Sequence, residues 1–164
     1  MISEYLLILS VLVSVLGSLF PALLDSPAKL LLDFFFLPDA FSVAIAFLTL
    51  FFFAREVEQK AGPLRLAVLY FAGVAVSMAV SPGKTPAWGG LDAVLGALVA
   101  LDPWQSMFVE FYPIPVVAAA GFFIVSKLVL TSSFEIASLL VGIAYGYLVL
   151  GTTQAERKWA PARK

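Results

Sequence analysis

Six long uncharged stretches between charged residues constrain what this chain can fold into. They contain 20, 15, 18, 9, 16 and 20 residues. A helix needs about 20 mostly apolar residues to cross the roughly 30 Å hydrocarbon core of a bilayer. The stretches cover residues 5–24, 40–54, 66–83, 93–101, 111–126 and 136–155. We therefore predict an all-α polytopic membrane protein with six helices.

The composition excludes several classes of protein. Hydrophobic residues make up 62% of the chain and charged residues 13%, whereas soluble domains have about 45–50% and 25%. The net charge of −1 comes without a basic tract, so we expect no nucleic-acid partner. The sequence contains no cysteine and no histidine. Thiol chemistry, the commonest general base and the commonest metal ligands are therefore missing, and we expect neither a metal nor a cofactor.

The fourth stretch is too short to cross a bilayer. Nine residues span about 14 Å as a helix, and extending the helix toward its N-terminus brings Asp92 inside the membrane boundary. A carboxylate there is costly unless it meets water or a partner, and irregular backbone cannot face lipid. We therefore expect a short fourth helix that is surrounded by the other helices and open to a wet cavity. The single domain covers 1–164, with helices near 4–24, 38–59, 63–81, 89–102, 112–130 and 134–152.

The basic residues predict how the chain is oriented in the membrane. With the N-terminus in the cytoplasm, seven of the ten lysines and arginines lie on the cytoplasmic side. These seven are Arg55, Lys60, Arg65, Arg157, Lys158, Arg163 and Lys164. The positive-inside rule then places both termini of this multi-pass protein in the cytoplasm. The N-terminal segment has no basic region and no small-residue cleavage site, so we interpret it as an anchor.

Two groups of residues carry more specific information. Gly62-Pro63 predicts a tight turn between the second and third helices, and Glu58 and Arg65 flank it closely enough to form an ion pair. Small residues on the fourth and sixth helices predict that these two helices pack closely. The small residues are Gly96, Ser138, Gly142 and Gly146.

Asp92 and Glu135 lie at the non-cytoplasmic ends of the fourth and sixth helices. They are either hydrated helix ends or a functional pair of carboxylates. The sequence leaves both interpretations open.

The order of these features resembles the rhomboid superfamily, the six-helix intramembrane serine proteases and their inactive relatives. The resemblance covers roughly residues 39–151. Its parts are Glu58-x3-Gly62-x2-Arg65-x4-Tyr70, Gly89-Gly90-x2-Ala-Val-Leu-Gly96-Ala97, Tyr112-Pro113-Ile114-Pro115 and Ser138-x3-Gly142-x3-Gly146.

The resemblance also implies where catalytic residues would stand. Active rhomboids use a serine nucleophile on the fourth helix, a histidine base on the sixth, and second-helix donors that stabilise the oxyanion. The serine position falls on Leu91, or on Asp92 after a one-residue slip. The histidine position falls on Glu135, and the second-helix positions fall on Ser42 and Ala46. A serine–histidine mechanism cannot operate with these residues, so we expect a catalytically inactive pseudoprotease.

Inactive relatives such as the derlins are binders of membrane clients. The resemblance therefore implies a non-enzymatic adaptor in quality control or trafficking, whose partners are membrane lipid and the transmembrane helices of other proteins. Two alternatives remain open. One is a small transporter or ion-coupled protein that uses Asp92 and Glu135, and the other is a structural subunit of a membrane complex.

Overall fold

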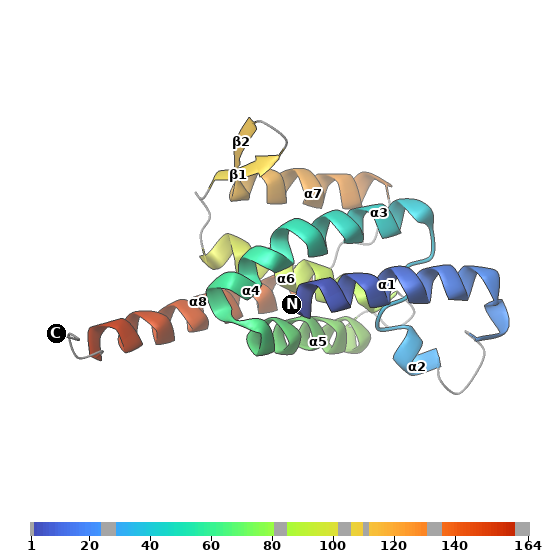
Figure 1. Cartoon of the computed structure of the whole chain (residues 1–164), viewed down its shortest axis with the longest axis horizontal. Helices are drawn as coiled ribbons and strands as arrows, with labels where there is room; N and C mark the ends of the chain where they lie inside the picture. The colour runs from blue at the N-terminus through green and yellow to red at the C-terminus, as the bar shows by residue number, and fades with distance from the viewer. Residues whose placement is uncertain are drawn as a thin grey trace.

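The computed structural model of the chain describes residues 2–23, 29–80, 85–101, 106–109, 112–130 and 136–159 (Figure 1). Its main helices are α1 (Ile2–Leu19), α3 (Ala40–Leu48), α4 (Arg55–Ala61), α5 (Pro63–Val80), α6 (Ala87–Leu101), α7 (Val116–Leu130) and α8 (Ile136–Trp159). A π-helix, η2 (Thr49–Ala54), joins α3 to α4 without a break, so these three segments form one long helix. The short elements are a 3₁₀ turn, η1 (Pro21–Leu23), and a single helical turn, α2 (Lys29–Leu32).

A two-stranded hairpin is the one departure from helix among the described elements. Strands β1 (Ser106–Val109) and β2 (Tyr112–Pro115) pair antiparallel, with Ser106 opposite Pro115. The prediction of a fifth helix starting at residue 112 is therefore wrong, because α7 begins at Val116. Pro113 and Pro115 explain the difference. Each lacks a backbone N–H and disfavours helical geometry in the residue before it.

Three helices in the described part of the chain are long and apolar enough to cross a membrane. They are Ile2–Leu19, Ala40–Ala61 and Pro63–Val80, of 18, 22 and 18 residues. The apolar helices Ala87–Leu101, Val116–Ser126 and Ile136–Leu148 are shorter. The helical fold and these three spans support the membrane assignment made from composition.

Helix α6 is short and surrounded by other helices, as its charge spacing predicts, and the wet cavity expected beside it stays a prediction. Thirteen of its 15 residues are buried. It packs against α5 on one side and α8 on another, and it also contacts η2, α4 and α7. Figure 1 shows it at the centre of the bundle. The burial explains how Gly89, Gly90 and Asp92 are accommodated in this helix, since none of them has to face lipid.

The turn between α4 and α5 and the C-terminal end of α8 lie toward the same end of the bundle, with α2 at the other (Figure 1). Helix α8 continues to Trp159, beyond the predicted boundary near residue 152. Its last turns project past the rest of the molecule (Figure 1).

Candidate functional site

The contact between α6 and α8 depends on glycines. A methyl group added to Gly142 would overlap the carbonyl oxygen of Ala93, and one added to Gly96 would overlap that of Leu139. A methyl group added to Gly146 would likewise overlap Ala97 and Ala100. Backbones approach this closely only where side chains are absent. The predicted close packing of the fourth and sixth helices is confirmed.

Small polar groups meet where α5, α6 and α8 come together. The hydroxyl of Ser138 on α8 donates a hydrogen bond of 3.1 Å to the carbonyl oxygen of Gly73 on α5. Gly89 of α6 lies between them, with no room for a side chain. Ser77 is buried beside Gly89, and its hydroxyl has no hydrogen-bond partner among the described residues. The three helices are therefore held at van der Waals distance by a cluster of serines and glycines.

The residues that the sequence resemblance assigned to a serine position lie inside the bundle. Leu91 is 3% exposed and Asp92 is 1% exposed. Asp92 is therefore not a hydrated helix end. Glu135, its predicted neighbour, lies outside the described residues, so the proposed carboxylate pair remains a prediction.

Ser42 and Ala46 have a local structural role. The backbone N–H of Ser42 donates to Asp39 Oδ1 at 2.8 Å, and its hydroxyl donates to Asp39 Oδ2 at 2.6 Å. Asp39 thereby caps the N-terminus of α3, and the Ser42 hydroxyl beside it lowers the pKa of its carboxyl. Ala46 is buried in the apolar core. The hydroxyl of Ser42 is thus bound within its own turn.

Glu58 binds the beginning of α1, and the predicted ion pair with Arg65 is wrong. Its two carboxylate oxygens accept hydrogen bonds from the backbone N–H groups of Ile2, at 2.8 Å, and Ser3, at 3.0 Å. The hydroxyl of Ser3 donates to the same carboxylate. Because the first N–H groups of a helix have no partner within it, a carboxylate at this position satisfies two of them and neutralises the positive end of the helix dipole.

The turn predicted at Gly62-Pro63 is confirmed. Gly62 has φ +94°, a left-handed conformation that favours glycine. Its N–H donates to the carbonyl oxygen of Glu58 at 2.8 Å, which ends α4, and Pro63 then begins α5. Arg65 is half-buried in the first turns of α5.

Tyr70 on α5 is a connecting residue whose role the sequence did not reveal. It is fully buried, and its hydroxyl donates to the carbonyl oxygen of Phe34 at 3.0 Å. Its hydroxyl also bonds the side chain of Ser10 on α1. Its ring stacks on Phe35, with centroids 6.0 Å apart, and covers Gly90 of α6. Tyr70 therefore joins α1, α5, α6 and the segment after α2.

The serines of α1 form the other half of this connection. Ser3, Ser10 and Ser14 are buried on one face of α1, and the Ser14 hydroxyl accepts a 3.0 Å hydrogen bond from the N–H of Leu37. These serines are spaced by seven and four residues, which places them on one helix face, and that spacing in an otherwise apolar helix is a signal that would have identified the face.

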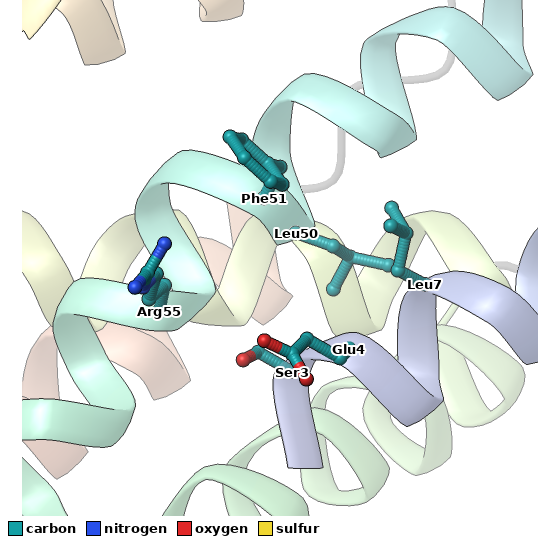
Figure 2. A pocket seen from close by; sticks show the side chains of 6 residues that line it. All are labelled: Ser3, Glu4, Leu7, Leu50, Phe51 and Arg55. Atoms are coloured by element: carbon teal, nitrogen blue, oxygen red, sulfur yellow. The ribbon is translucent and has the colours of Figure 1, made fainter. Parts of the chain in front are cut away.

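A small cavity separates α1 from the π-helix. Figure 2 shows Ser3, Glu4 and Leu7 on one wall and Leu50, Phe51 and Arg55 on the other. Its volume is about 20 Å³, which is enough for one water molecule. The site is therefore too small for an organic ligand.

No known protein family, curated protein or solved structure matches this chain. Within the described residues there is no group of three or more carboxylate, histidine or cysteine side chains placed to hold a metal ion. The candidate site is therefore the buried α6 and its contacts, and its chemistry is that of helix packing around one enclosed carboxylate.

Proposed function

We propose that this protein is a rhomboid-like, non-catalytic multi-pass membrane protein that binds transmembrane segments of client proteins, as an adaptor in quality control or trafficking. The observation that carries the proposal is that the short helix α6 is enclosed by other helices, which leaves the equally short helix α7 to face lipid. A 15-residue helix spans about 22 Å, less than the hydrocarbon core, so the bilayer must thin or admit water beside α7.

Helix α7 offers the surface for a client. It too contains 15 residues, and Phe122, Val125 and Val129 expose 70%, 58% and 74% of their surface. Its packing contacts with other helices are sparse, and an edge-to-face contact between Phe123 and Phe53 of η2 is one of them. A client helix with polar residues is poorly solvated by a full-thickness bilayer. It gains stability next to α7, where the apolar layer is thinner.

Photocrosslinking tests this arrangement in the native membrane. A photoreactive phenylalanine analogue replaces Phe122 on α7 or, as a matched control, Ile8 on the exposed face of α1. Clients captured at position 122 and not at position 8 support the proposal. Equal capture at both positions, or lipid adducts alone, contradicts it.

The absence of serine-protease activity is part of the same proposal. A nucleophile, a base and an oxyanion site act as a unit, and their losses are strongly non-additive. We expect Leu91→Ser to stay inert toward a fluorophosphonate probe, because a hydroxyl without a base remains protonated and weakly nucleophilic. Specific labelling of the purified wild-type protein at any serine would overturn this expectation.

A second candidate function rests on the burial of Asp92. Carboxylates inside membrane segments commonly mark ion or proton pathways, which would make the protein a small ion-coupled transporter. Reconstituted vesicles with an internal pH dye distinguish the two functions. Proton flux that is lost in Asp92→Asn, while clients are still captured at position 122, would favour transport.

A further inference from the structure

An open groove separates the second half of α1 from the beginning of α3. Its volume is 340 Å³. Val15 and Leu19 form the α1 wall, and Leu37 and Val43 form the opposite wall. The two helices also pack against each other, so the groove lies between packed helices.

The polar groups of the groove are concentrated at one end. Ser14 and Ser18 also line it, but Ser14 donates to the carbonyl oxygen of Ser10 and Ser18 donates to that of Ser14. Asp39 differs from both. An ionised carboxylate offers about four acceptor positions, of which the Ser42 N–H and hydroxyl and the Phe41 N–H use three. Asp39 is exposed, so its remaining capacity faces outward at the edge of the groove.

The volume of the groove favours a thin occupant. One turn of helix, about 10 Å across and 5.4 Å long, occupies on the order of 420 Å³, which is comparable with the whole groove. A spanning helix has five or more such turns and is far larger than the groove, whereas a segment of one acyl chain is thin enough to lie along it. An acyl chain also matches the apolar walls, because burying each methylene contributes about 0.8 kcal/mol.

The charge at the edge of the groove determines which lipid head group would bind there. Asp39 is the charged residue among those that line the groove, and its carboxylate is exposed. It attracts a cationic group and repels an anionic one. We propose that the groove binds one chain of a phospholipid whose head group carries a primary ammonium, of the phosphatidylethanolamine type, with the ammonium donating hydrogen bonds to Asp39.

The experiment compares two lipids on the purified full-length protein. Phosphatidylethanolamine and phosphatidylglycerol with identical acyl chains are added in equal amounts in detergent, and retained lipid is measured by native mass spectrometry. We expect about tenfold more ethanolamine lipid to be retained, which corresponds to about 1.4 kcal/mol. Equal retention of both lipids by the wild-type protein overturns the proposal.

Variants separate the head-group contact from the groove. Asp39→Asn keeps an effective helix cap and loses the charge, so the preference should fall to parity. Val43→Phe or Val15→Phe fills the groove and should reduce retention of both lipids. Leu12→Phe, on a face of α1 outside the groove, is the control and should bind as the wild type does.

Two results contradict the proposal directly. One is an unchanged lipid preference in Asp39→Asn. The other is a retained polypeptide that Val43→Phe and Val15→Phe displace while lipid binding stays constant. Thermal unfolding of each variant shows whether it is folded, and the two groove-filling variants on different helices guard against a packing defect in either one.

Discussion

Glu58 joins two segments that lie more than 50 residues apart in the sequence. It is 7% exposed, and it accepts hydrogen bonds from Ile2 and Ser3. Leaving buried donors unsatisfied costs about 1–3 kcal/mol. We therefore predict that Glu58→Ala lowers the free energy of unfolding by about that amount, as measured by denaturant titration in detergent.

Two further variants test the partner of Glu58. Glu58→Gln retains one acceptor oxygen and should be intermediate. Arg65→Ala should change the unfolding free energy by less than about 1 kcal/mol, as expected of a charge at the membrane surface. If Arg65→Ala destabilised the protein as much as Glu58→Ala, the ion pair predicted from the sequence would be the correct interpretation.

The stability of the protein also depends on the missing side chain of Gly142, which lies in an apolar contact between helices. An added Cβ would overlap the Ala93 carbonyl group, and α6 cannot move away because it is packed on several sides. We predict that Gly142→Ala destabilises the protein by about 1–3 kcal/mol, the usual range for overpacking.

Gly121 on α7 is a matched control for Gly142. A Cβ there would meet nothing within 4 Å. Gly121→Ala should therefore be neutral or slightly stabilising, because alanine favours helix by about 0.5–1 kcal/mol. Equal thermal shifts for the two substitutions would show that close packing at Gly142 contributes nothing.

At the scale of elements, the π-helix η2 interrupts the second long helix. Thr49 donates its hydroxyl to the carbonyl oxygen of Ile45, and Leu50 and Phe53 are buried in the core. A π-helical segment contains an inserted residue relative to an α-helix. Removing one residue there should restore continuous α-helix while α3 and α4 keep their buried faces.

We therefore predict that deletion of the exposed residue Phe51 leaves the protein folded, as judged by size-exclusion chromatography and thermal unfolding. Deletion of the exposed residue Ala75 within α5 is the control. It rotates Ser77 by about 100° relative to Gly73 and should abolish folding. If both deletions abolish folding, the π-helix is required for the fold.

At the scale of the whole molecule, charge predicts orientation. Arg55 and Lys60 lie in α4, Arg65 lies in the first turn of α5, and Arg157 and Lys158 lie in the last turns of α8. The α4–α5 turn and the end of α8 lie toward the same end of the bundle (Figure 1). The positive-inside rule places that end in the cytoplasm, and we propose this topology for the protein.

The lack of native cysteine allows a direct test of this topology. Lys60→Cys in α4 and Thr85→Cys before α6 each introduce a single thiol. We predict that an impermeant maleimide labels Thr85→Cys in intact cells. Lys60→Cys should be labelled only after the cells are lysed. Labelling of Lys60→Cys in intact cells would reverse the orientation.

The sequence alone determined the properties that depend on local pattern. Long uncharged runs predicted apolar helices, Gly62-Pro63 predicted the turn after α4, and the spacing of Gly142 and Gly146 predicted close packing with α6. Each of these follows from hydrophobicity, backbone geometry or side-chain size within a few residues. The enclosure of α6 was predictable for the same reason, since its length and its carboxylate already exclude a position facing lipid.

Only the tertiary structure decided which polar groups meet. Glu58 and Arg65 flank a turn and are close enough in sequence to form an ion pair. Glu58 nevertheless binds the first turn of α1. Tyr70 reaches Phe34 and Ser10, and Asp39 stands at the edge of a groove whose other wall belongs to α1. The physical reason is that an apolar helix needs only an apolar environment, whereas a hydrogen bond needs one partner at about 3 Å. That partner is set by how helices far apart in the sequence pack together.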